Sequence, residues 1–495
     1  MKKIHAKERV IMNWEMIIFI IYFVFMLAIG LYFFFKPNKA DSGDKGYFLG
    51  GRQMGAWVSA LSAGASDMSA WVLMGLPASI FAAGMGQTWI AIGLLIGYIL
   101  SWIFEAPRLR RFSIKAKDSI TIPQYLTNRF LSSSKVLQVL CSLIFLVAYT
   151  VYAASSIKAC GTLFNIVMNI PAETAMYIAA AIIISYTFLG GFSAVCWTDF
   201  FQGMLMLGAL LVAPLFALAL VENPAQEMQV LSAAGFFNFT SSWQDIVSGM
   251  GWGLGYFGMP HIIVRFMSIR SQKELKKSRV IGISWTAIIL LMAVAVATIG
   301  KMFLGEIEDT STVFIQMVRM IFPPILAGIC LSAILAASMS TADSQLLASA
   351  SAFASDLYKP VIRKDKAGEK EMLWVGRIVV MAIAIVALFI AKNPNSASIM
   401  GLVENAWGVF GAAFGPAIML SLFWKRFNFP GAVAGILAGA VVDILWLVVL
   451  KSTGIYEIVP GFIAGLIVAV VVSLVTKAPS AEVVALFDEA VASED

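Results

Sequence analysis

An acidic residue, Asp67, stands inside the apolar segment 54–81, in the stretch Ser62-Ala-Gly-Ala-Ser-Asp-Met-Ser-Ala-Trp71. At about 1.5 Å per residue, it would lie about 18 Å into a hydrocarbon layer about 30 Å thick. A carboxylate at that depth persists only where it faces a partner or a hydrated cavity. The small residues before it would let the helix open and offer carbonyl oxygens, and no Lys or Arg lies nearby in the segment. The stretch therefore predicts a place for a small cation and, with it, ion-coupled transport.

A second apolar segment is interrupted by the sequence Gly249-Met-Gly-Trp-Gly-Leu-Gly-Tyr-Phe-Gly-Met-Pro-His261. Each Gly disfavours a continuous helix by about 1 kcal/mol and Pro by about 3 kcal/mol. A break at membrane depth is tolerated only where it lines a cavity or is buried in protein. Trp252 and Tyr256 are four residues apart and would share one face of a helical turn. These aromatic residues predict a solute-binding wall; close helix packing by the glycines and an interfacial aromatic belt are the alternative.

A third polar stretch, Ser338-Met-Ser-Thr-Ala-Asp-Ser344, lies within the apolar segment 322–350. Hydroxyl and carboxylate oxygens suit a hard cation. A Ser or Thr hydroxyl can instead hydrogen-bond to its own helix, but five polar side chains in seven residues exceed that explanation. We expect Ser340 and Thr341 to coordinate the ion, and Asp343 to be a candidate for a second ion site.

Four further residues have two interpretations each. Asp199, in the stretch Gly190–Gln202, could cap a helix or belong with Asp343 to the second ion site. Arg52, just before segment 54–81, could anchor the inner side or act in gating. Tyr152 and Trp71 could complete the aromatic wall, or simply pack in the core.

The composition identifies a helical membrane protein that crosses the bilayer many times. The chain has 495 residues, of which 60% are hydrophobic and only 13% are charged. The four cysteines stand singly, so they predict neither disulfides nor a metal site. The apolar stretch 13–35 is too long for a signal peptide and predicts a retained helix. The sequence has no paired Ser/His or clustered metal ligands across these segments, so we do not expect an enzyme.

Runs of apolar residues predict about thirteen transmembrane helices. They cover 13–35, 55–82, 87–105, 136–157, 172–190, 198–221, 246–266, 280–304, 322–350, 373–391, 398–424, 429–450 and 459–476.

The distribution of basic residues orients these helices. If the first helix runs from outside to inside, most of the 35 Lys and Arg lie in inner loops, among them the loop from Arg265 to Arg279. Loop 222–245 would be outside, and it has no basic residue. The basic residues before position 10 disagree with this assignment. We expect the N-terminus outside, and the C-terminus in the cytoplasm with a short acidic tail, 478–495.

The two interrupted helices are five spans apart, and an odd offset forces opposite orientations. Secondary transporters place substrate and ion between discontinuous helices at corresponding positions of two such halves. We therefore expect residues 1–477 to form one transmembrane domain, in which 54–221 and 246–424 are inverted five-helix repeats. Helices 13–35, 429–450 and 459–476 would be additional to this core.

Taken together, these motifs resemble the sodium/solute symporter family from about Asn13 to Lys477. The most specific stretches are Ser62–Trp71 with Leu73–Pro77, Gly190–Gln202, Gly251–His261 and Leu335–Leu346. The resemblance implies the leucine-transporter fold, sodium as the coupling ion, no organic cofactor, and import across a bacterial cytoplasmic membrane. It implies L-proline as the solute, with pantothenate or another amino acid as the alternative.

The resemblance also implies roles for single residues. Sodium would be bound by the carbonyl groups of Ala65 and Met68 and the hydroxyls of Ser340 and Thr341, supported by Asp67 and Ser69. The solute would contact Trp71, Tyr152, Trp252, Tyr256 and Pro260. Arg52 would take part in coupling at the inner side.

Overall fold

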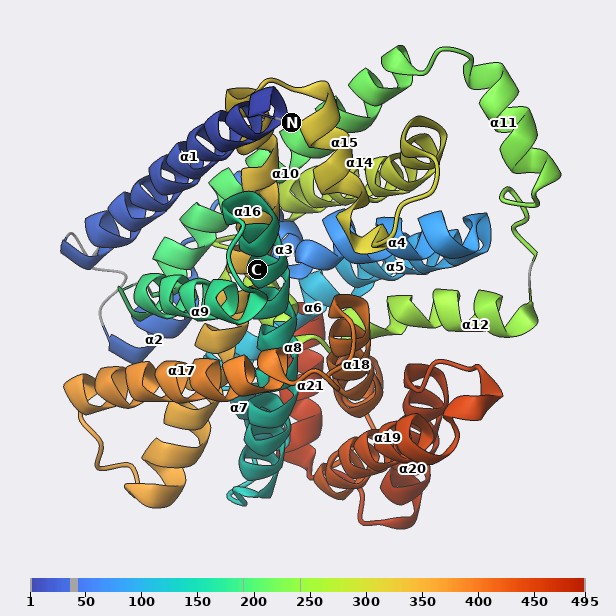
Figure 1. Cartoon of the computed structure of the whole chain (residues 1–495). Helices are drawn as coiled ribbons and strands as arrows, with labels where there is room; N and C mark the ends of the chain where they lie inside the picture. Colours follow the sequence, from blue (N-terminus) through green and yellow to red (C-terminus); the bar gives the residue numbers. More distant parts are fainter. Residues whose placement is uncertain (1, 36–42, 190, 241, 494–495) are drawn as a thin grey trace.

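A computed structural model describes residues 2–35, 43–189, 191–240 and 242–493 (Figure 1). Gly190, within one of the stretches singled out above, and the last two residues of the acidic tail lie outside this description. The described part of the chain is built of helices, with one isolated parallel bridge between Met54 and Ile269. The all-helical class predicted from the sequence is therefore confirmed.

The helices of the first half are α1 (Lys2–Phe35), α2 (Gly43–Leu49), η2 (Gly50–Arg52), α3 (Ala56–Asp67), η3 (Trp71–Gly75), α4 (Leu76–Ala83), η4 (Met85–Thr88), α5 (Trp89–Leu100), η5 (Ser101–Glu105), α6 (Ala106–Lys115), α7 (Ile122–Arg129), α8 (Val136–Met168), α9 (Ala172–Leu189), α10 (Phe192–Leu220) and α11 (Pro224–Ala233). Those of the second half are α12 (Trp243–Gly251), η6 (Trp252–Phe257), α13 (Pro260–Ser268), α14 (Gln272–Leu304), η7 (Thr310–Thr312), α15 (Val313–Ile321), α16 (Pro324–Ser351), η8 (Ala352–Ile362), α17 (Glu369–Lys392), α18 (Ile399–Phe423), α19 (Phe429–Val449), η9 (Lys451–Thr453), α20 (Ile458–Val475) and α21 (Ala481–Ala492).

Ten helices in the described residues are long and apolar enough to cross a membrane. Each corresponds to one of the predicted spans. The other three predicted spans are 172–190, which forms the shorter apolar helix α9, and the two interrupted segments 55–82 and 246–266. The multi-pass class is thus confirmed, while the count of thirteen stays a prediction.

Both predicted interruptions are present. Helix α3 ends at Asp67, and Met68 leaves helical geometry with φ −78° and ψ 71° before the chain turns again at Trp71. In the second segment, α12 tightens into a 3₁₀ turn at Trp252 and is extended at Met259, and α13 begins with Pro260 in its first turn. Because Pro has no backbone N–H, it fits the first turn of a new helix and not the middle of an old one.

Helix α16 forms the centre of the molecule, packed against α3, α8, α10 and α1 (Figure 1). In the continuous helix Pro324–Ile362, which includes α16, 83% of the most apolar 18-residue stretch is buried inside the protein. Helices α19 and α20 pack together at one edge, where both contact α18. A central helix that is buried over most of its length is the arrangement that allows intramembrane hydroxyls and carboxyls.

The glycines of the second interruption bring its backbone against α5. A Cβ placed on Gly97 would lie 2.2 Å from the carbonyl oxygen of Gly253, and one on Gly253 would lie 2.3 Å from that of Gly93. A side chain at any of these positions would separate the two backbones. The packing interpretation of these glycines is therefore correct. The close approach also determines the positions of Trp252 and Tyr256, which alternate with the glycines in η6.

Candidate ion and solute site

The ends of the two broken helices meet at Asp67. This residue closes α3 and is fully buried. The Tyr256 hydroxyl, from the 3₁₀ turn η6, donates a hydrogen bond to Asp67 Oδ2 at 2.5 Å. The other oxygen, Oδ1, is buried without a hydrogen-bond partner in the described residues. One carboxyl group thus joins the predicted ion side of the site to the predicted solute side.

Hydroxyls of α16 reach the unwound end of α3. The Ser340 hydroxyl lies 2.8 Å from the Ala65 carbonyl oxygen and 3.2 Å from that of Ala337, so it can donate to either. Thr341 Oγ1 is buried and has no hydrogen-bond partner within the described chain. Met68 follows at the break itself. The predicted sodium ligands therefore come from two neighbouring segments, and their role stays a prediction.

Ser69 shapes the break. Its backbone N–H donates to the Asp67 carbonyl at 2.9 Å, and its side-chain oxygen lies 3.5 Å from the Trp71 backbone nitrogen. The Trp71 indole N–H also donates to the Asp67 carbonyl, at 3.2 Å. These bonds satisfy backbone groups that the broken helix leaves unpaired.

Aromatic rings line the opposite side of the break. The ring centroids of Trp71 and Trp252 are 6.4 Å apart, and those of Trp252 and Tyr456 are 5.0 Å apart. Tyr256 packs edge-on against Tyr98 at 5.1 Å and Trp407 at 5.2 Å. Such rings offer flat apolar faces with specific contact geometry. Trp71, Trp252 and Tyr256 thus belong to a larger group of aromatic rings, whose role as a solute-binding wall stays a prediction.

Three residues of this wall were missed from the sequence: Tyr98, Trp407 and Tyr456. Each stands in or next to an apolar segment, where aromatic residues are common, and no local signal distinguishes it. Trp407 also donates its indole N–H to the Trp252 carbonyl at 2.8 Å. The tight 3₁₀ turn is thus supported from α18.

Tyr152 lies near the break, beside a histidine. Its ring centroid is 6.4 Å from that of His261, and its hydroxyl is buried without a hydrogen-bond partner among the described residues. His261 Nε2 lies 3.1 Å from the Ser66 carbonyl oxygen, while Tyr149 contacts Nδ1 at 3.3 Å. Because a carbonyl only accepts, Nε2 carries the proton of a neutral imidazole. His261 therefore braces the end of α3.

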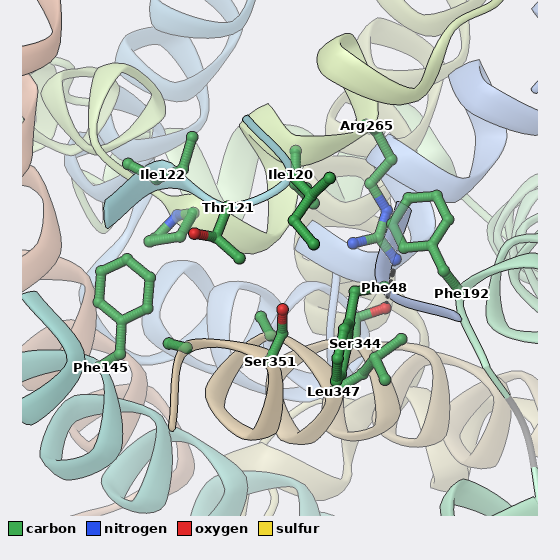
Figure 2. A pocket seen from close by; sticks show the side chains of 14 residues that line it. Phe48, Ile120, Thr121, Ile122, Phe145, Phe192, Arg265, Ser344, Leu347 and Ser351 are labelled. Carbon is green, nitrogen blue, oxygen red and sulfur yellow. Dashed lines mark hydrogen bonds between the residues drawn. The ribbon is translucent and has the colours of Figure 1, made fainter. Parts of the chain in front are cut away.

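Pro260 and the aromatic wall face different cavities. A small cavity of about 30 Å³ is lined by Pro260, Arg265, Ser344 and Thr121, among others (Figure 2). Another, of about 240 Å³, is lined by Trp252 together with Glu404 of α18 and with Tyr456 and Glu457, which precede α20. Asp67 is fully buried and lines neither cavity.

Asp199 does not cap a helix. Helix α10 begins at Phe192, and Asp199 lies inside it, where its Oδ2 pairs with the Arg265 guanidinium at 3.1 Å and accepts the Ser62 hydroxyl at 2.6 Å. The cap interpretation is wrong for that reason. The other predicted member of a second ion site, Asp343, is buried in α16. That second site stays a prediction.

Arg265 is a second correction. The sequence placed it at the end of an inner loop, but it is buried in α13 and contacts Ser62 at 3.0 Å and Ser344 at 2.5 Å. The segment around Asp67 has no Lys or Arg of its own, but Arg265 reaches its Ser62 from α13. Its ion pair with Asp199 makes both charges tolerable at that depth.

Arg52 connects the inner ends of the two broken helices. Its guanidinium donates to the Met267 carbonyl of α13 at 2.6 Å and pairs with Asp118 at 2.9 Å. Burial lowers the pKa of Arg52, and the Asp118 carboxylate acts in the opposite direction, which keeps the side chain charged. Next to it, the backbones of Met54 and Ile269 form the isolated bridge. These contacts close the side of the site where the basic loops lie.

A helical bundle with two broken helices and buried polar groups at the break is typical of ion-coupled secondary transporters. The chain belongs to the Sodium:solute symporter family, which it matches over residues 47–439. It is 43% identical over 480 residues to the osmoregulated proline transporter OpuE of Bacillus subtilis (strain 168), covering 95% of this chain and 96% of that one. It is also 43% identical to the high-affinity proline transporter PutP of the same organism, over 94% of this chain and 98% of that one. A sodium/proline symporter of Staphylococcus aureus (strain JH9) is 42% identical, over 96% of this chain and 95% of its own length.

Solved structures share the fold. A sodium-coupled sialic acid symporter in an outward-open state superposes with a TM-score of 0.80 at 21% identity, over 94% of this chain and 98% of that one. Mhp1, a nucleobase-cation-symport transporter in a closed conformation, gives 0.57 at 14% identity, over 91% and 99%. The leucine-transporter type of fold implied by the sequence motifs is therefore confirmed, and this chain is a transporter with sodium as coupling ion.

Proposed function

We propose that this protein imports L-proline together with sodium across the bacterial cytoplasmic membrane. The observation that carries the proposal is the hydrogen bond from Tyr256 to Asp67. It joins an aromatic residue of the solute wall to the carboxyl at the ion side of the break. The proline-transporting relatives, aligned over nearly the whole chain, support the choice of solute.

The aromatic wall suits proline. Its compact pyrrolidine ring can lie against the faces of Trp71 and Trp252, whose side chains are at most 3% exposed. The start of η3 at Trp71 presents the positive end of a short helical segment, which favours a carboxylate. A zwitterion of this size would therefore be held by its ring on one side and its carboxylate on the other.

Sodium would be held by oxygens of two segments. The carbonyls of Ala65 and Met68 and the hydroxyls of Ser340 and Thr341 supply neutral oxygen donors, and Asp67 supplies the negative charge. Ser340 and Ala65 already touch, so both oxygens could turn to the ion with little movement. An ion that fixes the end of α3 also fixes Asp67 and, through it, Tyr256. Sodium and proline would then strengthen each other's binding by the same factor.

The Arg52 contacts fit alternating access. The charge distribution supports an orientation in which the basic side, with Arg52, faces the cytoplasm, with the N-terminus outside and the C-terminus inside. Release of proline and sodium would require the contacts of Arg52 with Met267 and Asp118 to open. Arg52 would thus act as a gate between the two broken helices.

The test is uptake of labelled proline into proteoliposomes containing the purified protein. We expect concentrative uptake when sodium is higher outside, and none when potassium replaces it. Unlabelled proline should compete, whereas pantothenate should not. Uptake that does not depend on the sodium gradient would contradict sodium coupling. Competition by pantothenate but not by proline would contradict proline as the solute.

A further inference from the structure

Two buried carboxyl groups face each other away from the ion and solute site, in the corner formed by α18, α19 and α20. Asp443 lies within α19 and is fully buried. Glu457 directly precedes α20 and is 6% exposed. Neither residue contributes to the mechanism described above.

The two side chains share space that glycine provides. A Cβ placed on Gly408 of α18 would lie 2.8 Å from Asp443 Oδ1 and 3.3 Å from Glu457 Cγ. A Cβ on Gly461 of α20 would lie 3.0 Å from Asp443 Cβ. The Asp443 carboxyl group and the Glu457 side chain therefore both lie against Gly408 of α18, and any larger residue there would displace them.

Both carboxyl oxygens of Asp443 and Oε1 of Glu457 are buried without a hydrogen bond in the described residues. Glu457 also lines the cavity next to Trp252, together with Glu404 of α18, Lys451 of η9 and Asp245 of α12. The positive charge of Lys451 acts on Glu457, whereas no ion pair reaches Asp443 in the described residues. Two ionised carboxylates this close in an apolar region are strongly disfavoured, because each is desolvated and each repels the other.

Lys451 offsets part of the charge of Glu457 but not that of Asp443, so a further positive charge at Asp443 would relieve the repulsion, and the donor set decides which. A hard metal cation takes several oxygen ligands. The pair offers three unpartnered oxygens, and nowhere in the described chain do three His, Cys, Asp or Glu side chains gather as metal ligands. We propose that Asp443 and Glu457 form a proton-binding site that holds one shared proton and exchanges it with the outer solution.

The shared proton can reach the pair through the neighbouring cavity, and its loss would affect the aromatic wall. Glu457 and Glu404 line the cavity that also contains Trp252 of the aromatic wall, and under the proposed orientation this cavity lies on the outer side. Tyr456, next to Glu457, stacks on Trp252 at 5.0 Å and donates its hydroxyl to the Glu404 carbonyl at 2.8 Å. Loss of the proton would add a negative charge between α18, α19 and α20 and push them apart. Tyr456 would move with α20, so external pH would act on the outer side of the solute pocket.

Infrared difference spectroscopy of the purified protein in lipid tests the site without any transport measurement. We expect a carboxylic-acid C=O band that disappears as the pH rises, and that is absent in Asp443→Asn. Glu457→Gln removes the partner and should shift or abolish the same transition. Asp245→Asn removes a carboxyl from the same cavity but not from the pair, and should leave the band in place. A band unchanged in both pair variants would overturn the proposal.

A second measurement tests the effect on transport, and it alone rests on the proposed function. Proline affinity of the parent should depend on external pH, and Asp443→Asn, which fixes the neutral state, should lose that dependence. An identical pH profile in parent and variant would overturn the link to the solute pocket. Absence of proline binding at every pH in the parent would instead contradict the proposed solute, while the infrared result would still stand.

Discussion

Tyr256 and Asp67 are 189 positions apart in the chain, yet the tyrosine hydroxyl lies 2.5 Å from the carboxylate oxygen. Each residue stands at the break of its own helix. The proposed solute wall and the proposed ion-binding end of α3 are therefore in direct contact. Coupling between proline and sodium needs no long path through the protein, because one hydrogen bond connects the two groups that would respond to them.

Tyr256→Phe keeps the ring and removes this hydrogen bond. A hydrogen bond to a charged group contributes about 1.5–3 kcal/mol, so we expect the half-saturating sodium concentration to rise roughly tenfold to a hundredfold. Initial rates of proline uptake over a range of sodium concentrations measure it. Tyr177→Phe, which also removes a tyrosine–carboxylate hydrogen bond but at an exposed position, should have no effect. Tyr256→Ala should in addition raise the half-saturating proline concentration, because the ring is lost.

Thr341→Val replaces a buried hydroxyl without a hydrogen-bond partner by a methyl group of similar size. We expect weaker sodium activation with unchanged folding, since the only loss is one oxygen donor. The matched control is Thr150→Val in α8, whose hydroxyl bonds to the Leu146 carbonyl of its own helix. Equal sodium dependence in both variants and the parent would show that Thr341 does not bind the ion.

Asp67→Asn and Asp67→Glu separate charge from shape. The asparagine keeps the size but removes the charge, whereas the glutamate keeps the charge and shifts it by one methylene group. We expect Asp67→Glu to retain sodium-dependent uptake with reduced sodium affinity and Asp67→Asn to lose nearly all uptake. If Asp67→Asn transports as well as the parent at low sodium, the carboxylate has a structural role only.

The sequence predicted the breaks but not what meets at them. Gly, Pro and Asp at membrane depth are local signals, so the ends of α3 and η6 could be placed from the residues alone. The contact of Ser340 with Ala65 joins residues 275 positions apart, and only the family resemblance suggested it. The contribution of Trp407 has no local signal, because it depends on the packing of α18 against η6.

Arg265 is the clearest example of a residue whose position could not be predicted from the sequence. It stands at the end of an apolar segment and next to a basic loop, so charge patterning assigned it to the inner surface. Its burial is determined by Asp199, which comes from α10 and cannot be paired with it from sequence spacing. An intramembrane charge is stabilised by its partner, and the partner is known only once the helices are packed.

Variants of Arg265 and Asp199 can distinguish two roles of Asp199: a partner in a structural ion pair, or a ligand of a second sodium ion. Breaking a buried pair leaves one charge uncompensated and costs about 3–5 kcal/mol. We therefore expect Asp199→Asn to lower the unfolding temperature of the purified protein in detergent, whether or not sodium is present. Arg265→Gln should do the same, and the double variant should recover part of the loss, because neither charge remains buried alone.

If Asp199 bound a second sodium instead, Asp199→Asn would leave the sodium-free protein as stable as the parent and would remove only the stabilisation that sodium adds. Thermal unfolding of the four proteins with and without sodium distinguishes the two outcomes.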